Sequence, residues 1–140
     1  MISAKLNAAT VDIFTKGCCW QLALELSNRE GWPIYCFGDG TNEAFHGYKF
    51  WMGHVVVSPR KGLYLDAYGL WGKEELRDEW EGRLVRYTIY QFKPQPHMLN
   101  FGVWGESAPT STVRKTSEKL INFYSLHKTR KVRNGHIDND

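Results

Sequence analysis

The sequence predicts one α+β domain in which a helix packs on an antiparallel sheet, and three observations lead to this prediction. The chain has 140 residues, and its 42% hydrophobic and 24% charged content is ordinary for a globular domain. An amphipathic helical pattern near the N-terminus precedes several β-rich segments, and helical patterns return later. This order, without regular alternation of strand and helix, is typical of α+β proteins.

The first predicted helix covers residues 18–30. One apolar face runs along it at helical spacing and contains Cys19, Leu22, Ala23 and Leu26. Gly31 lies just past the end of this pattern and Pro33 follows, which is a common arrangement at a helix C-terminus. The apolar face therefore predicts the side of the helix that packs on the sheet.

Strands and shorter helices follow this first helix. The predicted strands are 34–37, 51–58, 63–66 and 83–92. A turn signal runs from Pro59 to Gly62, so the segment 51–66 is predicted to be a hairpin. The further predicted helices are 73–80 and 113–127, and the predicted irregular segments are 38–50 and 97–112.

The net charge of +3 is concentrated near the C-terminus. Residues 113–140 carry 7 Lys/Arg and 3 Asp/Glu, whereas residues 1–112 carry 11 and 12. The basic segment from Lys128 to Arg133 could contact a nucleic acid. Because the rest of the chain is not basic, we favour a solvated, flexible tail over residues 128–140 that follows a folded domain over residues 1–127. Nucleic-acid binding is therefore not expected.

The cysteines predict free thiols. Two of the three, Cys18 and Cys19, are adjacent, and a bridge between neighbours is strained, so with Cys36 they make a poor disulfide framework. The N-terminal residues lack an apolar stretch of signal-peptide length, and no segment approaches the roughly 20 apolar residues of a membrane span. We therefore expect a reducing, cytoplasmic compartment and no membrane partner.

One cysteine is a candidate nucleophile. A thiol attacks as its thiolate, and the positive end of a helix N-terminus favours that form. Cys18 and Cys19 both open the predicted helix, but only Cys19 shares the apolar face, whereas Cys18 is rotated about 100° away, toward the side of Gln21. Because we expect the base on the sheet, Cys19 is the better candidate.

His54 and Asp66 complete a predicted triad with Cys19. A cysteine nucleophile needs a histidine base within reach, and a third group orients the imidazole. His54 lies in the predicted strand 51–58, and Asp66 ends the next strand. A three-residue turn between these strands puts the two side chains on one face, whereas a four-residue turn puts them on opposite faces. The sequence permits the contact without requiring it.

Several short motifs together resemble the papain-like cysteine hydrolases. Gly-x-Cys-Trp at residues 17–20, followed by Leu-Ala, is similar to the start of the active-site helix in papain-like proteases. His-Val at 54–55 and Tyr-Leu-Asp at 64–66 resemble strands of the compact members, including the NlpC-type peptidoglycan peptidases. The closest resemblance is to small bacterial and phage proteins that combine these motifs with Gly-Trp-Pro, present here at 31–33.

This resemblance implies a papain-like fold and a thiol hydrolase that cleaves an amide or peptide bond in a peptide, a protein or another amide-containing substrate. By the resemblance, Cys19 is the nucleophile, His54 the base and Asp66 the orienting residue, with no cofactor and no metal. Papain-like proteases also have an oxyanion-stabilising glutamine shortly before the cysteine, and residues 11–14 of this chain contain none. The Cys19 backbone N–H could supply one donor, and the sequence identifies no second donor.

Other interpretations of these residues stay open. Acyl transfer and deamidation use the same Cys–His–Asp chemistry. A binding or inhibitor protein on a papain-like scaffold is a further alternative, because a fold does not determine an activity. A zinc site is disfavoured, because its candidate ligands lack the paired spacing of structural zinc sites; these are Cys18, Cys19, Cys36, His46 and His54.

Overall fold

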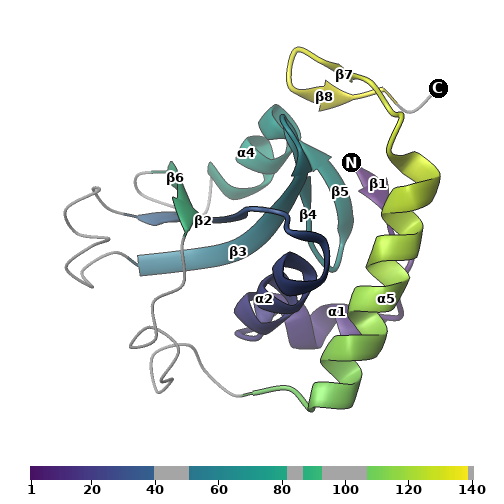
Figure 1. The fold of residues 1–140 in the computed structure, drawn as a ribbon. Helices are drawn as coiled ribbons and strands as arrows, with labels where there is room; N and C mark the ends of the chain where they lie inside the picture. Colours follow the sequence, from purple (N-terminus) through teal and green to yellow (C-terminus); the bar gives the residue numbers. More distant parts are fainter. Residues whose placement is uncertain (40–50, 82–86, 93–106, 139–140) are drawn as a thin grey trace.

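The computed structural model describes residues 1–39, 51–81, 87–92 and 107–138 (Figure 1). The helices in these residues are α1 (Ala8–Thr15), α2 (Cys19–Glu30), α4 (Lys73–Glu81) and α5 (Thr110–His127). The main sheet has the spatial order β1 (Ile2–Ser3), β5 (Gly69–Gly72), β4 (Leu63–Leu65), β3 (Trp51–Arg60), β2 (Ile34–Asp39) and β6 (Tyr87–Phe92). Neighbouring strands are antiparallel throughout. The predicted α+β class is confirmed.

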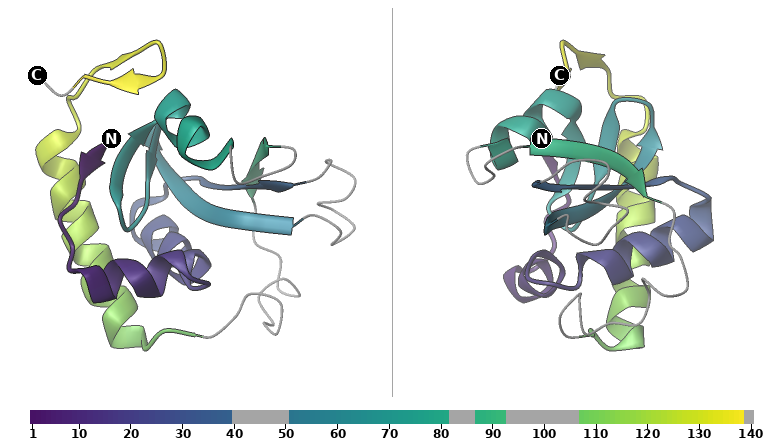
Figure 2. Two further views of the ribbon diagram at one scale, coloured as in Figure 1. Left: turned by 180° about the vertical axis from the view of Figure 1, so that it is seen from behind. Right: turned by 90° about the vertical axis from the view of Figure 1, so that its left-hand side faces the viewer.

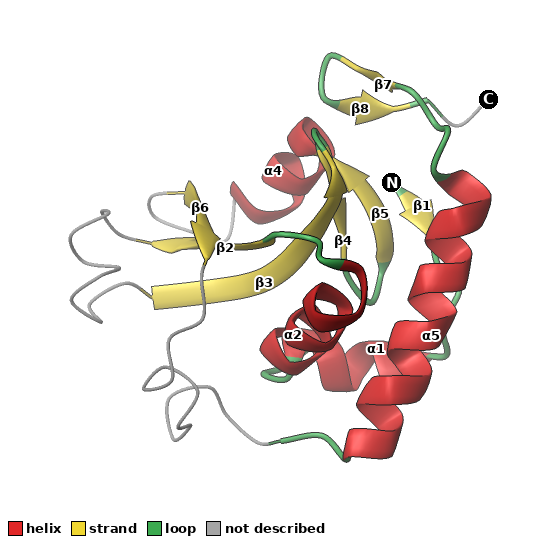
Figure 3. Ribbon diagram, in the orientation of Figure 1, coloured by secondary structure: helices red, strands yellow, loops and turns green. Residues whose placement is uncertain are grey.

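Helices cover both faces of this sheet (Figure 2). Along β3, Val55 and Val57 belong to an apolar cluster that includes residues of α1, α2 and α5. Val56, between them, belongs to a second cluster that includes residues of α4. This alternation follows from the two-residue period of a strand. The helix that carries Cys19 and the helix α4 therefore lie on opposite faces of the sheet, as Figure 3 also shows.

Helix α2 matches the predicted helix over 18–30 to within one residue. Its buried residues are Leu22, Ala23 and Leu26. Gly31 adopts a left-handed conformation with a φ of 73°, and its N–H donates to the carbonyl oxygen of Ser27 at 2.8 Å. A glycine in this conformation is a common helix end, because it carries no Cβ to clash. The apolar face and the C-terminal stop signal are both confirmed.

Most other elements agree with the sequence patterns. The hairpin predicted over 51–66 is confirmed as β3 and β4, and the helix predicted over 73–80 is confirmed as α4. Helix α5 begins at Thr110 rather than at 113. The first residues of the strand predicted over 83–92 lie outside the described residues, as do most of the segments predicted to be irregular. The patterns do not predict β1, α1 or β5, because elements this short show little periodicity.

The C-terminal residues differ from the flexible tail expected over 128–140. Residues 132–137 form a hairpin of β7 (Val132–Arg133) and β8 (His136–Ile137). Ile137 is buried in the apolar cluster shared with α1, α2 and α5. The backbone N–H of Glu74 donates to the carbonyl oxygen of Gly135 at 3.0 Å, which ties the hairpin to α4. The guanidinium of Arg60 donates to the carbonyl oxygen of Lys128 at 2.6 Å. One buried side chain and backbone contacts dock this polar segment, and apolar periodicity does not detect such contacts.

Candidate active site

Cys19 is the accessible thiol of the protein. Residues 16–18 connect α1 to α2, and Gly17 among them has a φ of 119°. Cys19 is the first residue of α2. The first N–H groups of an α-helix have no partner within the helix, and they present a positive partial charge to a side chain at that end. All three cysteines are free, and Cys19 is partly exposed while Cys18 and Cys36 are buried.

Cys18 is the N-cap residue of α2 and is buried, which corrects the expectation that it lies off the packed surface of the helix. It is only 7% exposed and belongs to the same apolar cluster as Ala108 and Val113. Gln21 binds Ala108 of this cluster, because its Nε2 donates to the Ala108 carbonyl at 3.3 Å and its Oε1 accepts from the Ala108 N–H at 2.7 Å. These two hydrogen bonds tie the start of α2 to the residues just before α5.

A β-bulge lies in the hairpin that carries the other two candidate residues. At its tip Arg60 pairs with Leu63, whereas farther along Val57 pairs with Leu65. The two pairs are three residues apart on β3 but two residues apart on β4, so β3 contains one extra residue. Ser58 braces the bulge, because its Oγ lies 3.0 Å from the carbonyl oxygen of Arg60 and 2.8 Å from that of Leu63.

The bulge puts His54 and Asp66 on the same face. When the Val57–Leu65 pairing is continued along β3, position 54 is opposite position 68 and diagonal to Asp66. A two-residue turn without the bulge would shift this register by one residue and separate the two side chains to opposite faces. A two-residue turn followed by a bulge therefore produces the same register between β3 and β4 as the three-residue turn considered from the sequence.

His54 and Asp66 form a buried pair that reaches Cys19. The distance between His54 Nε2 and Asp66 Oδ2 is 2.8 Å, and the two residues are 2% and 4% exposed. The Cys19 side chain also interacts with this imidazole, and the interaction raises the pKa of His54. Since Nε2 is occupied by Asp66, Nδ1 is the nitrogen left for the thiol. The structure therefore brings together the three residues that the sequence singles out.

Asp66 is held by the turn that it begins. Its second oxygen, Oδ1, accepts from the backbone N–H groups of Tyr68 at 2.9 Å and Gly69 at 3.2 Å. The same oxygen accepts from the indole Nε1 of Trp71 at 2.9 Å. The backbones of Asp66 and Gly69 also exchange two hydrogen bonds of 3.1 Å. With Oδ1 held by three donors, Oδ2 stays directed at His54.

The charges at this site favour a protonated His54. Burial lowers the pKa of His54, because a charged ring loses hydration. The hydrogen bonds to Asp66 and Cys19, together with their charges, act in the opposite direction and raise the pKa from 6.5 to about 10. Burial and the nearby Cys19 charge raise the pKa of Cys36 to about 12, so Cys36 stays a neutral thiol.

Sequence reasoning missed the aromatic residues around the His54–Asp66 pair. Trp71 donates to Asp66, and Trp80 of α4 stacks on His54. Phe37 packs edge-on against both the imidazole and the Trp80 indole. A buried indole N–H needs an acceptor, so Trp71 near Asp66 is a signal that could have been used. No sequence pattern indicates that Trp80 reaches His54.

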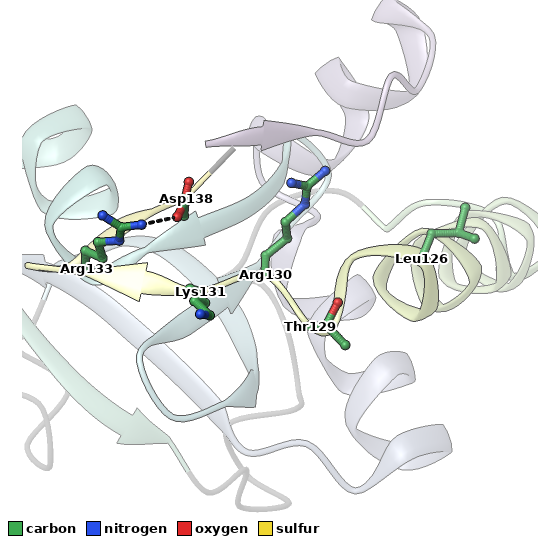
Figure 4. A pocket seen from close by; sticks show the side chains of 6 residues that line it. All are labelled: Leu126, Thr129, Arg130, Lys131, Arg133 and Asp138. Atoms are coloured by element: carbon green, nitrogen blue, oxygen red, sulfur yellow. Dashed lines mark hydrogen bonds and ion pairs between the residues drawn. The ribbon is translucent and has the colours of Figure 1, made fainter. Parts of the chain in front are cut away.

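A separate pocket lies between the end of α5 and the C-terminal hairpin (Figure 4). It is lined by Leu126, Thr129, Arg130, Lys131, Arg133 and Asp138. Asp138 Oδ2 accepts from Arg133 Nη2 at 2.9 Å, so a carboxylate neutralises part of this basic surface. None of the three candidate catalytic residues lines the pocket, and it is therefore distinct from the candidate active site.

Comparisons of this chain with protein families, with curated proteins and with solved structures found no match. In the part of the chain that the structure describes, no three His, Cys, Asp or Glu side chains are grouped so that they could hold a metal ion. Nor does any helix among those residues have the length and apolar character needed to cross a membrane. The candidate functional residues of the chain are therefore Cys19, His54 and Asp66.

Proposed function

We propose that the protein is a thiol hydrolase of papain-like type that cleaves an amide or peptide bond, with Cys19 as its nucleophile. One observation carries the proposal: a single buried imidazole is hydrogen-bonded to the Asp66 carboxylate at 2.8 Å and also interacts with the Cys19 side chain. This order of nucleophile, base and orienting group is the arrangement that activates a thiol. The free state of all three cysteines supports a reducing compartment such as the cytoplasm.

The first half of the reaction forms a thioester. The Cys19 thiolate attacks the carbonyl carbon of the substrate, and the negative charge moves to the carbonyl oxygen. The imidazolium of His54 then gives its Nδ1 proton to the leaving nitrogen as the carbon–nitrogen bond breaks. The amine leaves, the acyl group remains on Cys19, and His54 is neutral. Asp66 keeps the ring oriented through Nε2.

The second half releases the acid. His54, now neutral, takes a proton from a water molecule as that water attacks the thioester carbon. The carbon–sulfur bond breaks, the carboxylic acid leaves, and Cys19 returns as a thiolate beside an imidazolium. If an amine attacks in place of water, the same site performs acyl transfer, and a side-chain amide as substrate makes the reaction a deamidation.

The N-terminus of α2 is the candidate oxyanion site. The N-cap residue, Cys18, makes no side-chain capping hydrogen bond to the first turn. Backbone N–H groups at a helix start are suited to a developing oxyanion, because they point outward and add to the helix dipole. We propose that the N–H of Cys19 is one donor, which compensates in part for the lack of a glutamine before the cysteine.

The test is alkylation by iodoacetamide at pH 6, followed by peptide mapping of all three cysteines. We expect Cys19 to be modified much faster than Cys18 or Cys36, which act as controls within the same chain. His54→Ala should slow the modification of Cys19, because the thiolate loses its counter-ion. Cys19 reacting no faster at pH 6 than an unperturbed thiol, or slower than Cys18, would contradict the proposal.

A second measurement separates an enzyme from a binding protein. With p-nitrophenyl acetate as an acyl donor, wild-type protein should release nitrophenol and carry an acetyl group on Cys19, detected by intact mass. Cys19→Ser should lose both signals, because a hydroxyl is far harder to ionise at this site. Cys18→Ser should retain both. A reactive Cys19 that never forms the acetyl thioester would favour a binding protein over a hydrolase.

A further inference from the structure

Trp80 lies flat against the ring of His54. The two ring centroids are 5.3 Å apart, and the planes differ by only 14°. Phe37 meets the same imidazole edge-on at 5.4 Å and 69°, and it meets Trp80 at 5.1 Å and 66°. The candidate base is therefore packed by two aromatic side chains in addition to its two polar partners.

Helix α4 brings Trp80 to this position. Leu76 and Trp80 are one helical turn apart and face the same apolar cluster, in which Leu76 is fully buried. The start of α4 is fixed by the C-terminal hairpin, because the Glu74 N–H donates to the Gly135 carbonyl at 3.0 Å. The Ile137 N–H also donates to Glu75 Oε1 at 3.3 Å. The hairpin thus holds the helix that carries the aromatic partner of His54.

The three partners of His54 constrain different motions of its ring. A hydrogen bond to a ring nitrogen is strongest in the plane of the imidazole, so the 2.8 Å contact with Asp66 opposes rotation of the ring within that plane. A stacked indole instead prevents the ring from tilting out of the plane. The face of an indole also attracts a cation, so stacking favours the imidazolium over the neutral ring. Trp80 supplies both effects, which Asp66 alone does not.

We propose that Trp80 is a positioning residue for His54, which holds the plane of the imidazole and stabilises its protonated form. The proposal rests on the triad proposed above. Trp80 does not touch the reacting atoms in this scheme and acts only through His54. The competing explanation is that Trp80 merely fills the apolar cluster around Leu76. That explanation predicts a loss of stability without a change in the protonation of His54.

The experiment compares wild-type protein with Trp80→Leu and Trp80→Phe, and it uses Trp32→Leu as a matched control. Trp32 is also partly buried, but it packs on Tyr124 at 5.2 Å, among the helices on the other face. The first readout is the pH profile of Cys19 alkylation. We expect Trp80→Leu to shift the alkaline limb of this profile to lower pH by about half a unit, since cation–π energies correspond to a factor of about three. Trp80→Phe should be intermediate, and Trp32→Leu should leave the profile unchanged.

The second readout does not depend on the thiol. NMR titration of the His54 ring, assigned by comparison with His54→Gln, should show a lower pKa in Trp80→Leu than in wild-type protein. An unchanged titration in a folded Trp80→Leu variant overturns the inference. If Trp80→Leu does not fold, the same titration is measured on Trp80→Phe. A His54 titration in that variant identical to that of wild-type protein then overturns the inference. A wild-type Cys19 that is inert at pH 6 contradicts the proposed hydrolase instead, while the His54 titration still tests the role of Trp80.

Discussion

Asp66 and Glu75 each accept several hydrogen bonds, but the donors differ in kind. The donors to Asp66 are His54, the Tyr68 and Gly69 backbone N–H groups and the Trp71 indole. The donors to Glu75 are the Gly72 and Ile137 backbone N–H groups and the amine of Met1. Apart from His54, the donors to Asp66 in the described residues come from the turn that it begins and from Trp71 of the next strand, whereas Glu75 joins segments that are far apart in the sequence.

This difference separates a chemical role from a structural one. Asp66 holds a titratable ring that also contacts a thiol, so its removal changes how a proton is carried. Glu75 connects β1, β5 and the C-terminal hairpin, so its removal loosens the packing of the chain ends on α4. Asp66 and Glu75 accept similar numbers of hydrogen bonds, but the identity of the donors indicates a chemical role for Asp66 and a structural role for Glu75.

The largest expected effect comes from exchanging each carboxylate for its amide. Asp66→Asn should slow acyl transfer to Cys19 by about 10² or more, because the amide misorients His54 or selects the wrong tautomer. Glu75→Gln should stay within about twofold of wild-type protein, since it contacts none of the three site residues. Both are measured as acetyl-thioester formation at constant temperature on folded protein. Equal losses in the two variants would remove the distinction between the carboxylates.

Deletion of residues 129–140 should affect stability more than chemistry. It removes the buried side chain of Ile137 and the backbone contacts of the hairpin with Glu74 and Glu75. We expect the Tm to fall by roughly 5 °C or more, as a loss of a few kcal/mol implies for a domain of this size. Calorimetry measures this shift. A Tm unchanged by the deletion would restore the solvated, flexible tail.

Gly135 tests the same region with one added methyl group. A Cβ at Gly135 would lie 2.1 Å from Glu74 Cγ and 3.0 Å from the Glu74 backbone nitrogen. Gly62 also has a positive φ, but a Cβ there meets nothing within 4 Å. Gly62→Ala should therefore cost about 1 kcal/mol of backbone strain, and Gly135→Ala about 2–4 kcal/mol in urea unfolding. Similar losses of unfolding free energy in the two variants would mean that Gly135 does not pack closely against α4.

Ser58 tests the register that joins His54 to Asp66. Ser58→Ala removes the hydroxyl that bonds two carbonyl oxygens at the bulge, and we expect a loss of about 1 kcal/mol. Ser125→Ala is the control, because its hydroxyl bonds one carbonyl oxygen on an exposed helix surface. If the bulge depends on Ser58, alkylation of Cys19 at pH 6 should slow only in Ser58→Ala. Faster labelling in that variant would oppose the proposed link.

The pH dependence of unfolding also distinguishes His54 from Glu75. The folded-state pKa of His54 is raised, so its contribution is complete below pH 6.5 and is lost as the pH rises toward about 10. Burial raises the pKa of Glu75, but the Met1 amine and two backbone N–H groups lower it overall, so its contribution is lost as the pH falls below 4.5. In urea unfolding, His54→Gln should reduce the loss of unfolding free energy at alkaline pH. Glu75→Gln should reduce the loss at acid pH. The reverse pattern would contradict the assignment.

Local patterns accounted for the elements that carry the candidate site. The apolar face of α2, the glycine at its end and the β-rich run of β3 are each visible within a short window of sequence. Cys19 was separated from Cys18 by helical geometry, and the structure leaves Cys19 as the more exposed thiol. The same geometry did not foresee that Cys18 is buried, because its apolar cluster is formed by residues far apart in the chain.

The contact between His54 and Asp66 depended on a feature that periodicity does not contain. The sequence indicated a turn between Pro59 and Gly62 but not how many residues it uses. A bulge at Ser58 then changed the register by one residue, and one residue is enough to move a side chain to the other face of a strand. Bulges depend on local hydrogen bonds such as those of Ser58, and an alternating hydrophobic pattern does not indicate them.

The sequence by itself determined the α+β class, the helix start at Cys19 and the hairpin that holds His54 and Asp66, because these follow from local periodicity and turn chemistry. The tertiary structure alone decided the burial of Cys18, the docking of the C-terminal hairpin on α4 and the stacking of Trp80 on His54. The physical reason is the range of the interactions. Helix and strand patterns repeat within a few residues, whereas these contacts join surfaces that meet only after the chain has folded.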